Sequence, residues 1–495
     1  MSPEQPPTTP GVLFPPGPDG RRSTAAVGRA AVADALRPVD PAGARAAEQE
    51  TNWRSGYLVH FRRLVEAGLT TPEAAVTIAG HGIDGVRSRM VAGTAEGEVP
   101  LGTWAEAPAV RGHGTAEVQG TARPETELSL PYHGERLQGD ALLRRLDSWV
   151  STGVAEPSVA EAVRTVLAHP EWLRLEGHTV AVLGAGAEMG PLQALLRWGA
   201  RVAAVDLPRP AVWERVLSVA RAGAGTVLLP VPDGSDALDV ATAGADLVAE
   251  APSVADWLAG LRSEEDRLVL GNYVYADGAA NVAVSVAVDA LTTRVQQARP
   301  DVALAFLATP TDVFAVPGDA VAMSTRAYEQ RSAGAKLVGR PLRTLSAGRL
   351  LRRSYAPGAD PGVNDSLVPQ QGPNYALAKR LQRWRATVAR QAGTTVSMNV
   401  APPTRTRSVV KNRALAAAYA GAHRFGVEVF EPATSNVLMA VLLVHDLHTD
   451  GGPRHPQPWQ DEAYAAVHGG LWRTAYAPRS ALGLAALLGY GAARG

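Results

Sequence analysis

The spacing of hydrophobic positions changes near residue 175. Before that point, apolar residues recur at helical intervals in 44–68 and again in 70–90, where a Thr and a Pro stand at a helix start. The stretches "GDALLRRLDSWVSTGV" and "SVAEAVRTVLAHPEWL" have the same spacing, whereas residues 100–131 are short, Gly-punctuated runs typical of small strands or loops. The pattern predicts a mainly helical accessory domain over residues 20–175, preceded by a Pro-rich, disordered tail over residues 1–19.

From residue 176 onward, apolar runs of strand length alternate with helical stretches. The runs are "TVAVLG", "RVAAVD", "TVLLPV", "RLVLGNYVY", "DVALAFLAT" and "TTVSMNV". Strands that alternate with helices form a parallel sheet covered on both faces, with ligands at the carboxyl ends of the strands. The sequence therefore predicts an α/β fold, a doubly wound parallel sheet of Rossmann type, over residues 176–495.

Bulk composition narrows the possible functions. The chain has 495 residues with 48 basic and 48 acidic side chains, and no run of like charges, so we expect neither nucleic acid nor a membrane as a partner. It has no apolar stretch of membrane-spanning length and no signal-peptide layout, which predicts a soluble, cytoplasmic protein. The absence of cysteine excludes disulfides, thiolate metal sites and cysteine nucleophiles.

Three glycines lie between the first apolar run and its helix. Gly184, Gly186 and Gly190 would allow a tight turn and a close approach of the backbone to a pyrophosphate. Asp206 ends the second run, 22 residues after Gly184 (206 − 184), where a carboxylate can accept hydrogen bonds from ribose hydroxyls. These residues predict binding of NAD, with NADP possible because Arg209 is nearby; the alternative is that the glycines serve only a tight turn.

The stretch "GPNYALAKRL", residues 372–381, contains a tyrosine and a lysine that would share one face of a helix. Lysine is rare here: it occurs only at Lys336, Lys379 and Lys411, so 45 of the 48 basic residues (48 − 3) are arginine. An ammonium beside a phenol favours the phenolate, which lowers the tyrosine pKa toward the range useful for proton transfer. Tyr375 and Lys379 are therefore predicted catalytic residues, and the alternative is a solvated helix pair.

This layout resembles the short-chain dehydrogenase/reductase family over about residues 175–450, interrupted by an insertion. "LEGHTVAVLGAGAEMG" is similar to the opening strand and glycine loop of that family, "PNYALAK" to its Tyr-x-x-x-Lys helix, and "TVSMNVAPPTRT" to the strand and loop that follow. The resemblance implies hydride transfer between a nicotinamide cofactor and a carbonyl or alcohol substrate. It also implies a homo-oligomer.

The resemblance implies a role for each matching residue. Tyr375 would be the general acid/base and Lys379 would lower its pKa and hold the nicotinamide ribose. Thr309 would replace the catalytic serine, with Thr311 in reserve, and Asn281 would support the proton relay. Three further positions would contact the cofactor: Asn272, Pro402 and Thr406. The alternatives are that Asn281 only caps its helix and that Thr309 is an ordinary strand-end hydroxyl.

The sequence also departs from the family. Glu188 replaces the middle glycine of the loop, and "GNYVYADG" stands where an Asn-Asn-Ala-Gly turn is typical, leaving Asn272 as the matching residue. Asn281 follows that strand closely, so either "ADLVAE" is the true fourth strand or this crossover is rebuilt. Thr309 and Tyr375 are 66 residues apart (375 − 309), which predicts an insertion over about 312–370, either a substrate lid or an oligomer contact.

No metal site is predicted. His113, His133 and His178 are scattered, and "HDLHTDGGPRHPQ" is the single histidine cluster near acids. The sequence thus predicts an NAD(P)-dependent oxidoreductase that acts on a small-molecule substrate. The insertion makes a large substrate of this class possible. The alternatives are a non-redox lyase or epimerase on the same scaffold and a nucleotide-sensing protein without turnover.

Overall fold

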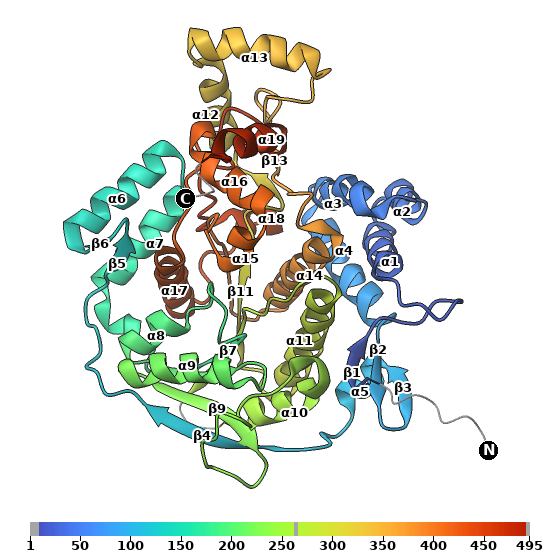
Figure 1. Ribbon diagram of the computed structural model, residues 1–495, viewed down its shortest axis with the longest axis vertical. Coiled ribbons are helices and arrows are strands. Elements are labelled where there is room, and N and C mark those ends of the chain that lie inside the picture. Colours follow the sequence, from blue (N-terminus) through green and yellow to red (C-terminus); the bar gives the residue numbers. More distant parts are fainter. Residues whose placement is uncertain (1–8, 262–265, 492–495) are drawn as a thin grey trace.

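A seven-stranded sheet lies at the centre of the computed structural model, which describes residues 9–261 and 266–491 (Figure 1). The strand order is β14-β11-β10-β7-β8-β9-β4. The strands are β4 (His113–Gln119), β7 (His178–Leu183), β8 (Arg201–Val205), β9 (Thr226–Pro232), β10 (Arg267–Asn272), β11 (Ala303–Ala308) and β14 (Val396–Val400). All neighbours are parallel except β4, which runs antiparallel to β9. The predicted α/β fold with a doubly wound parallel sheet is confirmed.

All six apolar runs identified in the sequence form strands of this sheet. In chain order they are β7, β8, β9, β10, β11 and β14, and their spatial order reverses direction between β7 and β10. "ADLVAE" is not a strand, because it leads into helix α10 (Leu247–Gly260). The fourth strand is therefore β10, and the crossover that follows it is the rebuilt part. Ligands of doubly wound sheets bind where the strand order reverses.

One face of the sheet is covered by helices from both halves of the chain. These are α10, α11 (Ala279–Ala298), α14 (Gly372–Gln391), and the N-terminal helices α1 (Thr24–Leu36), α2 (Pro41–Glu48), α3 (Trp53–Gly68) and α4 (Pro72–Arg87). Alternate strand residues such as Leu183 and Phe306 share a core with Phe61 of α3 and Trp384 of α14. Helices α1, α3 and α4 thus pack on α14, which lies between them and the sheet, and α2 packs on α1 and α3 (Figure 1).

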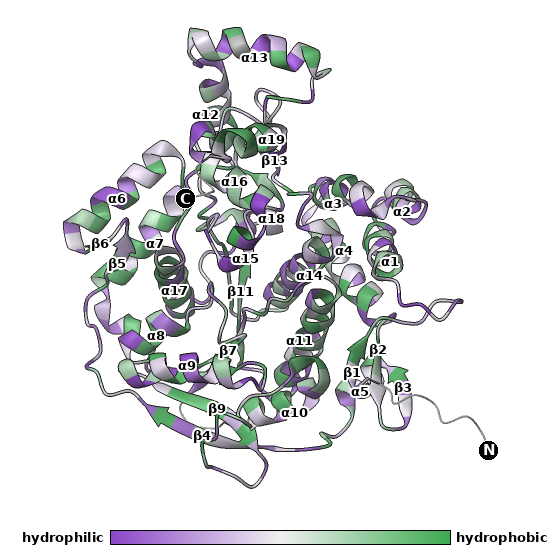
Figure 2. Ribbon diagram, in the orientation of Figure 1, coloured by the Kyte–Doolittle hydropathy of each residue, from purple (hydrophilic) through white to green (hydrophobic). Residues whose placement is uncertain are grey.

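The opposite face carries the second core. Its helices are α6 (Gly139–Thr152), α7 (Pro157–Ala168), α8 (Leu192–Trp198), α9 (Pro210–Ala222) and α17 (Pro432–His448), with the 3-10 helix η1 (Pro170–Arg174) beside them. The intervening strand residues, such as Val182 and Ala305, pack here with Trp149, Trp213 and Leu442. Because these strands are buried on both faces, hydrophobic positions (green in Figure 2) predominate in them, which is why their sequences are apolar runs.

Residues 20–175, expected as one accessory domain, are distributed around the sheet. Helices α1 to α4 cover one face, β4 joins the sheet edge, and α6 and α7 cover the other face. Small elements complete this part: β1 (Gly11–Leu13), β2 (Val91–Thr94), β3 (Gly97–Pro100), α5 (Leu101–Glu106), β5 (Leu130–Tyr132) and β6 (Glu135–Leu137). Strand β1 lies within the tail expected to be disordered and pairs with β2; residues 1–8 lie outside the described residues.

The insertion at about 312–370 begins with a two-stranded ladder of β12 (Val313–Val316) and β13 (Gly362–Asp365). Between these strands, α12 (Gly318–Glu329) leads to α13 (Ala333–Leu345), which projects from the body of the molecule (Figure 1). The remaining elements are α15 (Arg407–Lys411), α16 (Arg413–Gly421), η2 (Ala422–Phe425), α18 (Pro458–Ala463) and α19 (Pro478–Gly489). Among the described residues, no helix combines the length and apolarity needed to cross a bilayer.

Candidate functional site

Tyr375 and Lys379 lie in the first two turns of α14, as predicted, beside the carboxyl end of β11. Helix α14 begins at Gly372, whose φ of +81° is a conformation that a side chain would disfavour. The i, i+4 spacing puts Tyr375 and Lys379 on one face. The Lys379 ammonium lies 3.4 Å from the carbonyl oxygen of Leu307, near the end of β11.

Thr309 directly follows β11 and meets the tyrosine. The side chains of Thr309 and Gln371 lie close enough to the Tyr375 hydroxyl to lower its pKa as hydrogen-bonding groups. The Thr309 hydroxyl is also 2.9 Å from that of Thr311, which donates to the Gln371 side-chain oxygen at 2.8 Å. The reserve candidate Thr311 is therefore part of the same network, and Gln371, which the sequence analysis missed, completes it.

Burial dominates the ionisation of both residues on α14. It raises the pKa of Tyr375 above the usual value, while hydrogen bonds from Thr309 and Gln371 act in the opposite direction. It lowers the pKa of Lys379 to about 8. Lys379 was expected to lower the tyrosine pKa, but it is not among the groups that perturb Tyr375.

A chain of amides connects Lys379 to the fourth strand. Its ammonium donates to the Gln382 side-chain oxygen at 3.1 Å, and the Gln382 amide donates to the Asn272 side-chain oxygen at 3.2 Å. Asn272 is the last residue of β10 and is buried, so its side chain is fixed at the point where the strand order reverses. Gln382 escaped the sequence analysis because only the fold brings residues 272 and 382 together.

Asn281 lies in the first turn of α11. Its side-chain oxygen accepts the backbone N–H of Ala276 at 3.1 Å, which holds the short loop between β10 and α11. The Asn281 side chain therefore holds the loop before α11 in place. This contact is closer to the alternative that Asn281 caps its helix than to a role in a proton relay. Gln382, not Asn281, makes the described side-chain hydrogen bond to Lys379.

The glycine loop joins β7 to α8 and contacts the end of β8. A Cβ on Gly184, where φ is +86°, would lie 3.0 Å from the Tyr273 carbonyl oxygen, and one on Gly186 would lie 2.8 Å from an Arg215 nitrogen. Position 184 therefore needs glycine, because of its positive φ and the neighbouring backbone, whereas at Gly186 the Arg215 side chain could move aside. Gly190 has room for a Cβ at ordinary contact distance, and its carbonyl accepts a hydrogen bond from Asn436.

Asp206 fastens this loop from the end of β8. One carboxylate oxygen accepts the Gly186 N–H at 2.7 Å and the other accepts the Leu207 N–H at 2.8 Å. Arg215, on α9, lies beside the same glycine, with its guanidinium 3.4 Å from the Gly186 carbonyl oxygen. Arg215 is a second cation, besides Arg209, near the carboxylate expected to bind the ribose.

Glu188 does not project freely into the loop. Its two carboxylate oxygens bind Arg407, one to the backbone N–H and one to the guanidinium Nε, both at 2.8 Å. Arg407 follows Thr406, whose hydroxyl is 3.0 Å from that of Ser408, and the carbonyl of buried Pro402 accepts from Thr404 at 2.9 Å. The pair thus brings the glycine loop together with the segment expected beside the nicotinamide.

Aromatic and apolar side chains surround the tyrosine. The rings of Tyr275 and Tyr375 meet edge to face with centroids 6.3 Å apart, and Tyr275 is 49% exposed, so it lies at an open side of the site. Tyr375 is close enough to Tyr419 to raise the pKa of Tyr419, so Tyr419 and its apolar neighbours form another wall of the site. That wall is an apolar cluster of Val368, Val409, Leu415, Tyr419 and Leu482.

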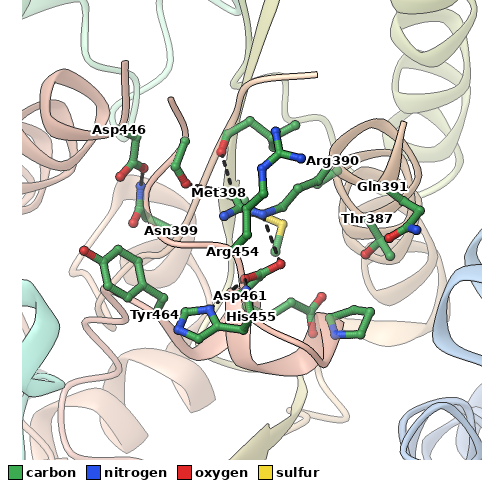
Figure 3. A pocket seen from close by; sticks show the side chains of 15 residues that line it. Thr387, Arg390, Gln391, Met398, Asn399, Asp446, Arg454, His455, Asp461 and Tyr464 are labelled. Carbon is green, nitrogen blue, oxygen red and sulfur yellow. Dashed lines mark hydrogen bonds and ion pairs between the residues drawn. The ribbon is translucent and has the colours of Figure 1, made fainter. Parts of the chain in front are cut away.

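A separate polar cavity of about 210 Å³ lies at the sheet edge, beside β14 (Figure 3). Its polar groups are paired with one another: His455 contacts Asp461 at 2.7 Å, and Asp446 accepts from Asn399 at 2.9 Å. Neither Tyr375 nor Lys379 lines it. Within residues 9–261 and 266–491 no three metal-binding side chains converge, the cluster of His445, His448 and His455 included.

Comparisons with known proteins give structural similarity alone. No protein-family profile and no curated protein matches the chain. An A1-type ketoreductase matches with a TM-score of 0.31 and 15% identity over 63% of this chain. An oxidoreductase of the short chain dehydrogenase/reductase family from Burkholderia thailandensis has a TM-score of 0.30, with 16% identity over 54% of this chain and 85% of its own. A C2-type ketoreductase from a modular polyketide synthase has a TM-score of 0.28, 15% identity, and coverage of 55% and 47% of the two chains. This chain spans about half (54%) of the A1-type ketoreductase it matches, so the geometry of the site carries the functional argument.

Proposed function

We propose that this protein is an NAD(P)-dependent oxidoreductase of short-chain dehydrogenase/reductase type. It would transfer a hydride between the nicotinamide and a carbonyl or alcohol substrate, with Tyr375 as general acid/base. The observation that carries the proposal is the convergence of Thr309, Tyr375 and Lys379 at the carboxyl end of β11. Three groups capable of proton transfer and oxygen binding thus lie where a doubly wound sheet binds its ligands.

The residues expected to hold the cofactor suit that role. Gly184 and Gly186 leave the backbone of the loop bare, Gly184 at a position that rejects a Cβ, and Asp206 is fixed at the end of β8. Asp206 would accept hydrogen bonds from the adenosine ribose and Lys379 would donate to the nicotinamide ribose. Arg215 and Arg209 supply positive charge that would let NADP bind as well.

When bound, the nicotinamide supplies or accepts the hydride at a carbon atom. Thr309 would donate a hydrogen bond to the substrate oxygen and so orient it. In the reducing direction Tyr375 would give its hydroxyl proton to that oxygen and regain a proton from solvent, and in the oxidising direction its tyrosinate would take the alcohol proton and release it to solvent. Lys379, held by Gln382, would stabilise the tyrosinate in either direction. The apolar wall around Tyr419 would exclude water and hold a substrate larger than a small alcohol.

Nucleotide binding is the first experiment. NADH and NADPH are titrated into the protein and into Tyr375→Phe, Lys379→Ala and Asp206→Ala, with nicotinamide fluorescence as the readout. We expect Asp206→Ala and Lys379→Ala to weaken binding at least tenfold, while Tyr375→Phe leaves it within twofold and abolishes turnover of carbonyl substrates. If neither nucleotide binds the unaltered protein, the proposal is wrong.

The Glu188–Arg407 pair favours a second candidate, in which nucleotide is bound without redox turnover. The pair joins the two segments that a cofactor would have to contact, and the high tyrosine pKa leaves the hydroxyl a poor base until a ligand changes its surroundings. Stoichiometric NADH oxidation with a carbonyl substrate supports the oxidoreductase. Nucleotide binding with no turnover on a carbonyl panel supports the sensor, and turnover without NADH oxidation supports a lyase or epimerase.

A further inference from the structure

A second cavity lies far along the insertion, between α12, α13 and the segment at 349–353. Its volume is about 330 Å³. The residues that line it are Tyr328, Glu329, Arg331, Lys336, Gly339, Arg340, Arg343, Leu351 and Arg353. Five of these are cations and one is a carboxylate. None belongs to the site around Tyr375, and the predicted lid or oligomer role of the insertion does not account for them.

Charge is concentrated around this cavity. Residues 326–353 contain eight lysines and arginines and one acid, Glu329, which gives +7 (8 − 1) in a chain whose total charge is zero. The other 467 residues (495 − 28) therefore carry −7 between them. These cations form no run in the sequence, because apart from the adjacent pair Arg352 and Arg353 they are three to six residues apart. The fold brings five of the eight onto one cavity.

Three of the arginines are held in place by tyrosine rings. The Arg331 guanidinium lies 3.5 Å from the centre of the Tyr328 ring and donates to the Tyr476 hydroxyl at 3.2 Å. Arg343 donates to the Tyr328 hydroxyl, and Arg353 lies 5.2 Å from the centre of the same ring. Cation–π contacts orient a guanidinium without neutralising it, so these contacts leave the positive charge available.

One carboxylate cannot balance the five cations. Glu329 pairs with Arg353 at 2.6 Å, and the Nε of Arg353 is buried without a hydrogen-bond partner. Among the ion pairs of the described residues, none involves Lys336, Arg340 or Arg343, which line the cavity from one side of α13. Figure 2 shows hydrophilic positions in purple along this helix, with hydrophobic positions between them.

We infer that this cavity binds a ligand with two or more negative charges on phosphate groups. Arginines present forked donors that match phosphate oxygens, and Lys336 adds a flexible point charge. The cavity holds a small anion such as pyrophosphate within reach of several of these donors. The phosphate could belong to a soluble molecule or to a lipid headgroup, since α13 projects from the body and its Leu337 and Leu345 are 76% and 86% exposed.

The test uses sodium pyrophosphate as the soluble probe, titrated into the full-length protein by calorimetry at low salt. The variant Lys336→Gln/Arg340→Gln removes two charges and breaks no described ion pair. We expect it to raise the dissociation constant at least tenfold. Arg144→Gln is the matched control, because Arg144 is exposed on α6, away from the cavity, and its loss should change binding less than twofold.

Vesicles of phosphatidylcholine, with and without phosphatidylglycerol, test the lipid source by co-sedimentation. Pyrophosphate binding lost in the double variant supports a soluble ligand, and vesicle binding that needs phosphatidylglycerol and is lost in the double variant supports a headgroup. The inference is overturned if neither probe binds or if the double variant binds like the unaltered protein. NADH is also titrated into the double variant. An equal loss of NADH affinity would mean that pyrophosphate had bound at the glycine loop and not in this cavity, and this result would also overturn the inference.

Discussion

Glu188 is the residue at which this chain differs most clearly from the family it resembles. A glycine at its position would leave the loop open, whereas the carboxylate binds Arg407 through two contacts of 2.8 Å. A pyrophosphate placed on this loop would meet a negative charge. It would also meet Arg407, provided that the arginine were released from Glu188. The Glu188–Arg407 pair can therefore oppose cofactor binding, or it can break so that Arg407 binds the cofactor instead of Glu188.

Glu188→Ala should tighten NADH binding about tenfold, because it removes a like charge near the pyrophosphate and frees the Arg407 guanidinium. The measurement is the NADH dissociation constant from nicotinamide fluorescence. The control is Glu176→Ala, which removes an exposed carboxylate that pairs with Arg174 at 3.1 Å. Unchanged or weaker binding in Glu188→Ala would show that the carboxylate does not obstruct the cofactor.

Lys379→Met should raise the melting temperature at pH 7. Burial lowers the pKa of Lys379 to about 8 from an ordinary 10.5, so the charged lysine destabilises the folded chain wherever both states are protonated, below pH 8. As the pH rises from about 8 to 10.5 the folded chain loses its proton first and this cost disappears. The advantage of Lys379→Met should therefore shrink across that range.

The check is a series of thermal melts from pH 7 to 10 for the protein, Lys379→Met and Lys411→Met. Lys411 is exposed on α15, so its replacement should leave the melting temperature unchanged at every pH. An advantage of the same size at pH 7 and pH 10 would mean that Lys379 titrates as an ordinary lysine does.

At the scale of elements, α14 is fixed by charges on residues one to two turns beyond the tyrosine. Asp312, which follows β11 and is 1% exposed, accepts from Arg380 at 2.8 Å and from Arg383 at 2.7 Å. Arg383 also binds Glu462 of α18 at 2.6 Å. Burial alone would raise the pKa of Asp312, but these two guanidiniums hold it below its usual value. The network keeps α14 in register with the end of β11, and so keeps Tyr375 beside Thr309.

Asp312→Asn should lower the free energy of unfolding by about 3–5 kcal/mol, because two buried guanidiniums lose their carboxylate. Urea denaturation measures the change. The same substitution at Asp147, which pairs with Arg164 on an exposed surface, should cost less than about 1 kcal/mol. Equal effects for the two substitutions would contradict a structural role for the buried network.

The elements that the sequence predicted well are those whose environment is uniform along their length. The strands from β7 to β14 were identifiable because each is buried on both faces. Strand β4, "HGTAEVQ", was not identified as part of the sheet, because an edge strand with exposed polar positions has no such run. The contacts Gln382–Asn272 and Arg407–Glu188 were also missed, since residues 110 and 219 positions apart leave no local pattern.

At the scale of the whole molecule, the N-terminal helices and the projecting insertion have opposite relations to the core. Helices α1, α3 and α4 bury residues such as Phe61 and Ile83 in the same core as α11 and α14. Helix α13 exposes Leu337 and Leu345 and projects outward (Figure 1). The N-terminal segment thus covers an apolar face of α11 and α14, whereas Leu337 and Leu345 of α13 are open to solvent.

Two deletions separate these roles. A chain lacking residues 1–110 should be insoluble or unfold without a sharp transition, because the apolar faces of α11 and α14 would lie open to water.

A chain in which residues 331–351 are replaced by a short Gly-Ser linker should be soluble and keep its NADH affinity. Its melting temperature should differ from that of the full chain by no more than about 2–4 °C. Thermal melts and nucleotide titrations of the soluble forms provide the comparison. If the chain lacking residues 1–110 folds and binds NADH, residues 20–110 are a dispensable addition. If the chain lacking residues 331–351 loses NADH binding, the insertion reaches the cofactor site in solution. The phosphate cavity on α13 would then have to be considered part of that site.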